Sequence, residues 1–155
     1  MSRIPSLLII ILLTTVACTG REDGFIVLSD SPSSRTFDPG EFLEYRVASA
    51  DSLSFYDIDI YARVHYSAEV DKIPLILRIV SPDGKKYADT LRLNISNNPA
   101  YPVYSRSGVW RDYRWSYRKG ISLPVIGTWY LRVDLIDGST PVNGLVEFGF
   151  ILSKR

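Results

Sequence analysis

Few side chains in this protein could act as a nucleophile, a base or a metal ligand. The 155 residues include one His, one Cys and one Met. His65 is the sole candidate base for a nucleophilic triad, and no G-x-S-x-G or similar motif places a Ser or Cys beside it. A disulfide within the chain is impossible, and a Cys/His zinc site is nearly so. We therefore expect His65 to be a surface or rim residue, and we expect no metal and no cofactor.

Two pairs of carboxylates have spacing that could support chemistry. Asp57 and Asp59, and likewise Glu69 and Asp71, are two positions apart. On a strand this spacing puts both carboxylates on one face, about 7 Å apart, which could serve glycoside hydrolysis or a divalent ion. Arginines and lysines stand close by in the sequence, so ordinary ion pairs on a solvated face are favoured. The residues therefore predict a protein that is not an enzyme.

The segment 106–119 combines positive charge with aromatic side chains. It holds five basic residues, one acid and four aromatics. As a strand, it would place Arg111, Tyr113, Trp115 and Tyr117 on one face, with Trp110, Asp112, Arg114, Ser116 and Arg118 on the other. If the aromatic face is core, the arginines lie outside and protect an edge strand from aggregation. Alternatively, the segment recognises a partner, because Arg, Trp and Tyr are enriched at binding hot spots.

We call this candidate surface the interaction strip. Its members are Trp110, Arg111, Tyr113, Arg114, Trp115, Tyr117 and Arg118.

The beginning of the chain predicts export and lipid attachment. A short cationic start and the apolar run 7–13 (LLIIILL) are followed by Ala17 and Cys18, the pattern of a secretory signal. The apolar region would span about 10 to 17 Å as a helix, against about 30 Å for a hydrocarbon core. A small residue followed by Cys resembles a bacterial lipobox. We therefore expect cleavage before Cys18 and acylation of its thiol, which anchors the protein in a lipid bilayer.

The charge of the protein argues against one class of partner. Eighteen Lys and Arg residues balance seventeen Asp and Glu residues, a formal net charge of +1. Proteins that bind nucleic acid without sequence preference carry a strong basic field. We expect no nucleic-acid partner.

From residue 41 onward, the chain alternates apolar and polar residues with period two. This pattern indicates half-buried strands, and no stretch shows a helical stripe. The expected strands cover residues 41–48, 54–66, 75–80, 87–95, 110–123, 128–136 and 145–152. Ser81-Pro82-Asp83-Gly84 supplies turn chemistry for a hairpin.

These strands predict an all-β fold, because one sheet could not bury so much apolar surface. The fold class is a single antiparallel β-sandwich, of jelly-roll or immunoglobulin-like kind, after a cleaved lipoprotein signal peptide. The expected organisation is a signal peptide at 1–17, the lipidated Cys18 with a tether and lead-in at 18–40, and the sandwich at 41–155. Within this, 30–40 is an irregular lead-in and 97–108 the longest internal loop.

The order of these elements resembles the GldH-type gliding motility lipoproteins of Bacteroidota. The resemblance covers roughly residues 50 to 154. It is carried by the lipobox and by segments 55–66, 76–85, 89–91, 123–130 and 144–154, with the Trp110 region leading into the fourth. After Tyr130 the chain departs from the family pattern. The resemblance implies an accessory lipoprotein of the gliding motility and type IX secretion machinery, and it transfers only Cys18 as a functional residue.

The sequence therefore leaves two candidate functions, which belong to different classes. In the first, the protein is anchored in the cell envelope, with the outer membrane favoured over the inner, and binds envelope proteins of that machinery through the interaction strip. In the second, it is a surface lipoprotein that binds carbohydrate, with Trp110, Trp115 or Trp129 as stacking platforms.

Overall fold

The computed structural model describes residues 24–95 and 104–155, and these residues form antiparallel strands and no helix. The strands are β1 (Phe25–Asp30), β2 (Thr36–Phe37), β3 (Phe42–Ser49), β4 (Phe55–His65), β5 (Lys72–Val80), β6 (Lys86–Asn94), β7 (Tyr104–Ser107), β8 (Trp110–Ser122), β9 (Gly127–Leu135), β10 (Val142–Asn143) and β11 (Leu145–Lys154).

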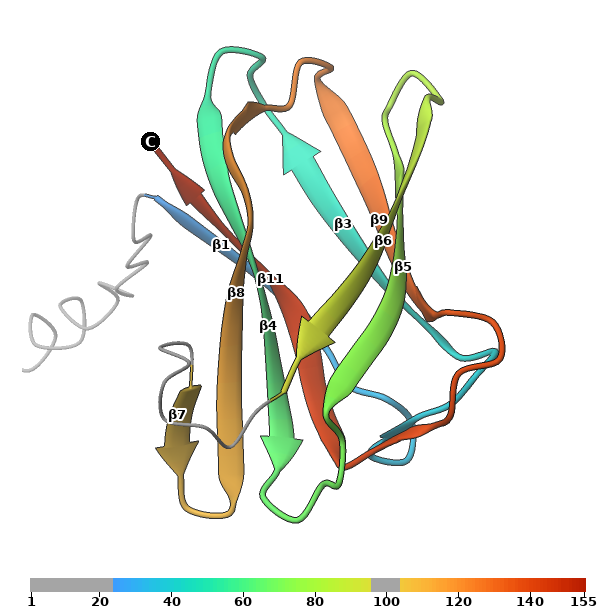
Figure 1. The fold of residues 1–155 in the computed structure, drawn as a ribbon. Helices are drawn as coiled ribbons and strands as arrows, with labels where there is room; N and C mark the ends of the chain where they lie inside the picture. The colour runs from blue at the N-terminus through green and yellow to red at the C-terminus, as the bar shows by residue number, and fades with distance from the viewer. Residues whose placement is uncertain (1–23, 96–103) are drawn as a thin grey trace, which may run out of the picture.

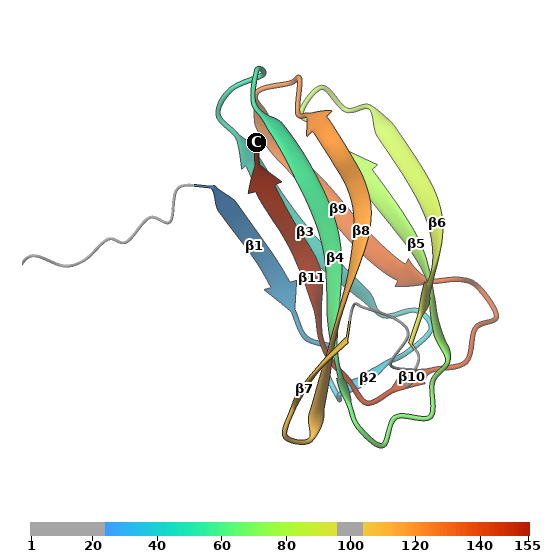
Figure 2. The same cartoon turned by 60° about the vertical axis from the view of Figure 1, so that its left-hand side comes forward.

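Two sheets pack face to face, as the predicted β-sandwich requires. One is five-stranded with the order β1-β11-β4-β8-β7, and the other is four-stranded with the order β3-β9-β5-β6 (Figure 1). The short strands β2 and β10 pair separately. Figure 2 shows the two layers from the side, with β2 and β10 near the end where β8 begins. The expected fold class is confirmed.

The core lies between the sheets because inward side chains alternate with outward ones. In β3 every second residue is buried, including Leu43, Tyr45 and Val47. The ring of Tyr45 meets that of Phe150 from the opposite sheet edge to face, with centroids 5.2 Å apart. The Tyr45 hydroxyl donates to the backbone oxygen of Phe148 at 2.9 Å. This hydrogen bond ties the two sheets together inside the core.

The predicted hairpin is present. β5 and β6 pair from Lys72 opposite Asn94 to Val80 opposite Lys86. The turn closes with the Gly84 N–H donating to the Ser81 oxygen at 2.9 Å. Gly84 has a φ of 84°, a left-handed conformation that glycine adopts without steric cost.

The predicted boundary of the sandwich at residue 41 is corrected, because the sandwich begins earlier in the chain, at β1. β1 lies in the predicted tether and pairs with β11, from Phe25 opposite Ser153 to Asp30 opposite Phe148. Ile26 and Leu28 pack against the core, whereas Phe25 and Val27 are 59% and 61% exposed. The sequence does not indicate this strand because residues 25–28 are all apolar, so the inward and outward positions cannot be told apart by polarity.

Two other short strands replace predicted irregular segments. β2 lies in the expected lead-in, and β7 lies in the expected loop 97–108. Both are too brief for a period-two pattern to be visible in the sequence. The predicted signal peptide and Cys18 lie outside the described residues, and no helix in the described part is long and apolar enough to cross a membrane.

Candidate interaction site

The interaction strip occupies the first two thirds of β8, which lies between β4 and β7 in the five-stranded sheet. β4 runs beside β8 from Phe55 to His65, but β7 pairs only with Trp110 to Tyr113. Beyond Tyr113, no strand of the described ranges pairs with the second side of β8. Backbone N–H and C=O groups along such an edge are available to another strand.

The aromatic face of β8 turns toward the core, which is one of the arrangements that the sequence left open. Tyr113 is 3% exposed, and its ring stacks on that of Trp115 with centroids 5.7 Å apart and planes 9° apart. Trp115 Nε1 donates to the backbone oxygen of Asn94 at 3.2 Å, which links β8 to the end of β6. Trp115 and Tyr117 both pack against the core cluster.

The charges on the outer face of β8 are paired with charges of β4. Arg114 Nη2 lies 2.6 Å from Asp59 Oδ2, and Asp112 Oδ1 lies 2.6 Å from Arg63 Nε. Arg63 also lies 3.7 Å from Glu147 of β11. The fold thus brings an acid alongside Arg114 and an arginine alongside Asp112, so both charges on this face are paired.

The carboxylate pair Asp57 and Asp59 is held in ion pairs. Asp57 accepts hydrogen bonds from Arg155 Nε at 2.8 Å and from the Gly120 N–H at 2.7 Å. The Arg155 hydrogen bond, more than any other group, holds the Asp57 pKa below its ordinary value, and the Gly120 N–H adds to the effect. The two carboxylates thus stabilise the sheet face, in agreement with the ion-pair interpretation.

The alternation of β8 breaks near Tyr117. The pairing with β4 shifts there, from Asp59 opposite Ser116 to Ile58 opposite Arg118. Such a bulge re-aims the side chains next to it. Tyr117 and Arg118 both reach Asp89 of β6 in the opposite sheet, with the hydroxyl at 3.0 Å and Nη2 at 2.9 Å from Oδ2. The prediction that Arg118 shares the outward environment of Arg114 is corrected.

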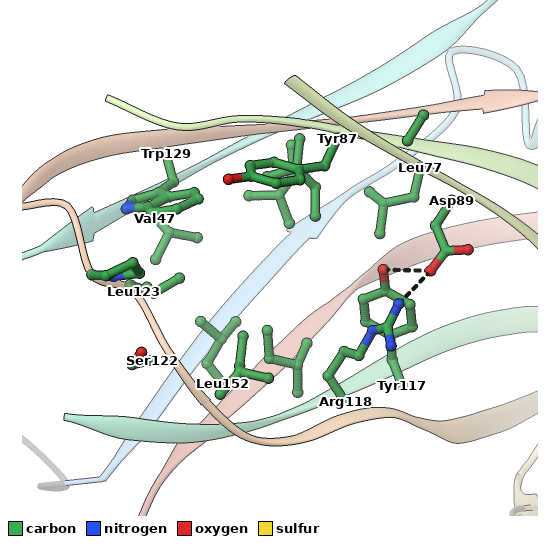
Figure 3. Close-up of a pocket in the computed structure, with 16 residues that line it drawn as sticks. Val47, Leu77, Tyr87, Asp89, Tyr117, Arg118, Ser122, Leu123, Trp129 and Leu152 are labelled. Atoms are coloured by element: carbon green, nitrogen blue, oxygen red, sulfur yellow. Dashed lines mark hydrogen bonds and ion pairs between the residues drawn. The ribbon is translucent and has the colours of Figure 1, made fainter. Parts of the chain in front are cut away.

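This contact stands beside a pocket between the two sheets (Figure 3). Its volume is about 550 Å³, and its walls include Val47, Leu77, Leu123, Trp129 and Leu152. Most voids in protein interiors are no larger than a water molecule. This pocket is much larger and could receive a side chain or a small apolar group. Figure 3 shows Tyr117, Arg118 and Asp89 gathered on one side of it.

Sequence reasoning missed the β6 contribution to this site. Tyr87 and Asp89 line the pocket opposite β8, and Tyr87 is 52% exposed. Burial raises the pKa of the Tyr117 hydroxyl above its ordinary value, and the Asp89 carboxylate adds to that effect. Asp89 and Arg118 are separated by 29 positions, and no local pattern indicated that they would meet.

The three tryptophans lie in different surroundings. Trp129 is 7% exposed, and its Nε1 donates to the Val125 backbone oxygen at 3.0 Å. Trp115 is on the inward face of β8 with its Nε1 bound to Asn94. Trp110 is partly exposed at the start of β8, where its ring meets His65 edge to face at 5.3 Å. Of the three, Trp110 is the one set among polar side chains.

His65 has a neighbour that no sequence motif indicated. Its Nδ1 lies 2.7 Å from Ser67 Oγ and also receives the Ser67 backbone N–H at 3.3 Å. The ring is partly buried at the end of β4, as expected for a rim histidine. Among the described residues, no group of three or more His, Cys, Asp or Glu side chains could hold a metal ion.

No family model matches the chain, and no curated protein matches it either. Within the described residues, the fold and the site form a β-sandwich in which the later part of β8 has no strand partner on one side and lies beside an apolar pocket.

Proposed function

We propose that this protein is a membrane-anchored cell-envelope lipoprotein, GldH-like, that serves as an accessory component of a gliding motility and type IX secretion machinery of Bacteroidota. It acts by binding other envelope proteins and carries out no catalysis. Acylated Cys18 holds it in a bilayer, with the outer membrane favoured, and the interaction strip faces its partner.

One observation carries the binding part of this proposal: the edge of β8 from Arg114 to Ser122, which no described strand covers, lies next to an apolar pocket. In β-strand addition, an extended segment of a partner pairs with an exposed edge, and pockets receive its alternate side chains. The backbone of β8 would supply hydrogen bonds, and the pocket would select for an apolar side chain. Arg118, Asp89 and Tyr117 would contact polar groups at the pocket entrance.

The position of β1 supports the anchoring part. β1 begins at Phe25, seven positions after Cys18. An extended chain of that length spans at most about 25 Å. A sandwich on so short a tether stays close to the lipid surface, which suits a component of a membrane-bound assembly.

The anchoring is tested by labelling cells with radioactive palmitate. The wild-type protein should carry the label and sediment with membranes. Cys18→Ala should lose both the label and membrane retention, because the thiol is the acylation site. Ser31→Ala, at an exposed serine near the end of β1, serves as the control and should keep both. Absence of label from the wild type would contradict the lipoprotein assignment.

The binding surface is tested with Arg114→Ala combined with Arg118→Ala. This double variant should reduce co-purification of gliding and secretion components at least about tenfold, as loss of binding hot spots does. Arg78→Ala is the matched control, because Arg78 also forms an exposed ion pair, with Asp134. Both residues belong to the four-stranded sheet, away from β8. Equal co-purification by the double variant and the control would remove the strip as the binding surface.

A further inference from the structure

A second recess lies where β4 ends and β8 begins, away from the β8 edge described above. Its volume is about 590 Å³. Three stretches of chain that are far apart in the sequence meet there: 34–36 around β2, 65–69 after β4, and 143–146 between β10 and β11. Trp110 completes the wall. Figure 2 shows β2 and β10 at this end of the sandwich.

Backbone hydrogen bonds join these stretches. The Gly144 N–H donates to the Arg35 oxygen at 2.9 Å, and the Gly144 oxygen accepts from the His65 N–H at 2.8 Å. Gly144 has a φ of 80°, and a Cβ there would lie 2.9 Å from Ala68 Cβ. The backbone around the recess is therefore held in place before any ligand arrives, as is usual for small-molecule sites.

One side of the recess is aromatic. Trp110 and His65 are paired residues of β8 and β4, and their rings meet at 76°. Their mutual packing orients the partly exposed indole. An indole offers a large, rigid apolar surface at low entropic cost, and the C–H face of a sugar ring is a matching apolar surface.

The remaining side chains offer polar groups of both kinds. Arg35 and Glu69 line the recess, and neither side chain has a hydrogen bond or ion pair with another described residue. Thr36 Oγ1 lies 3.2 Å from Asn143 Oδ1, so the Asn143 amide nitrogen still has donors to offer. Donors and acceptors around an aromatic wall suit a ligand rich in hydroxyl groups.

Charge and polarity narrow the class of ligand. Arg35 supplies one cation and Glu69 one anion, so the recess lacks the net positive charge that holds a phosphate. A polar wall also disfavours an acyl chain. We propose that this recess binds a neutral saccharide, with Trp110 as the stacking platform and Arg35, Glu69 and Asn143 as hydrogen-bonding groups. The site is separate from the lipid anchor and from the β8 edge between Arg114 and Ser122, although Trp110 also belongs to the interaction strip.

The experiment uses the full chain purified from membranes in detergent. Its migration is compared in native gels cast with and without soluble dextran, starch, xylan or mannan, and tryptophan emission is titrated with the disaccharides of the polysaccharide that retards it. We expect one polysaccharide to retard the wild type and its disaccharide to shift the emission. Trp110→Ala should weaken binding at least about tenfold, because stacking area is lost. Trp115→Phe should bind like the wild type.

Two further variants distinguish a loss of binding from misfolding. Glu69→Gln and Arg35→Ala change exposed side chains without core contacts, and each should weaken binding severalfold while the circular dichroism spectrum stays that of the wild type. The proposal would be overturned if none of the four polysaccharides retarded the wild type. It would also be overturned if Trp110→Ala, correctly folded, were retarded as strongly as the wild type. Either result would leave the palmitate and co-purification tests unaffected.

Discussion

Individual side chains on the outer face of the five-stranded sheet are arranged as opposite charges across strands. Arg114 forms an ion pair with Asp59, and Asp112 forms one with Arg63. Arg155 forms an ion pair with Asp57. Cross-strand pairs of opposite charge stabilise a sheet, whereas like charges directly opposite destabilise it. Because these pairs are partly exposed to solvent, each contributes modestly, and their main effect is on register and solubility.

The lowered pKa of Asp57 makes a pH-dependent contribution to stability. A carboxyl whose pKa is lower in the folded state stabilises the fold above its unfolded pKa of about 3.9. That contribution is lost as the pH falls through the lower, folded pKa. Asp57→Asn should therefore lower the urea midpoint at pH 7, and the difference from the wild type should shrink as the pH falls through the folded pKa.

The control for this experiment is Asp137→Asn, at an exposed turn residue. Its urea midpoint should match that of the wild type at pH 7. A constant difference between Asp57→Asn and the wild type from pH 7 to pH 2 would show that the carboxylate charge is not what stabilises this position.

Among the elements, β1 and the later part of β8 lie at the edges of the five-stranded sheet, because β7 pairs only with the start of β8. β1 contributes Ile26 and Leu28 to the core and leaves Phe25 and Val27 in solvent. β8 is covered by β7 at its start and free beyond Tyr113 within the described chain. Next to the register shift at Tyr117, the side chains of Tyr117 and Arg118 reach Asp89 of β6, and these two strip residues line the pocket.

Close backbone approach between β1 and β11 depends on Gly149. A Cβ at this position would lie 2.0 Å from the Leu28 oxygen and 2.7 Å from Tyr61 Cε1, so a substitution must displace the strand. Gly149→Ala should loosen β1, and its amides should exchange with deuterium faster than in the wild type, while the amides of β3 and β9 change little. Val27→Ala, on the exposed side of β1, should leave exchange nearly unchanged. Unaltered exchange in Gly149→Ala would show that β1 tolerates the clash.

At the scale of the whole molecule, the two sheets are joined by one aromatic contact region in the core. Phe150 of β11 is fully buried and packs edge to face against Tyr45 of β3 and against Phe148. The Tyr45 hydroxyl also spans the two sheets. The β8 edge and the Trp110 recess both depend on this packing, since β8 contributes side chains to each.

Phe150→Ala should destabilise the protein by about 3 to 5 kcal/mol, because it removes buried area and leaves a cavity. That is a large part of the 5 to 15 kcal/mol that is typical of a domain. Phe25→Ala removes the same side chain from a position 59% exposed and should cost less than about 1 kcal/mol. Urea unfolding compares the two variants. Equal losses would mean that Phe150 is not central to the core.

Local pattern was sufficient for much of the fold. Alternation with period two predicted seven strands and the sandwich, Ser81 to Gly84 predicted the hairpin, and the spacing in β8 predicted that Tyr113, Trp115 and Tyr117 share a face. These features depend on the pleat and on turn chemistry, which act between residues close in the chain. The strands β2, β7 and β10 hold too few residues to show a period, and in β1 the four consecutive apolar residues 25–28 hide the alternation.

The candidate sites depend on contacts between distant segments, which only the tertiary structure decides. The pairing of Arg114 with Asp59 joins residues 55 positions apart, and the recess beside Trp110 collects three separate stretches of chain. Strand order and register set which residues become neighbours, and a bulge at Tyr117 changes which way Arg118 faces. No local periodicity carries this information, because register is settled by the packing of the two sheets against each other.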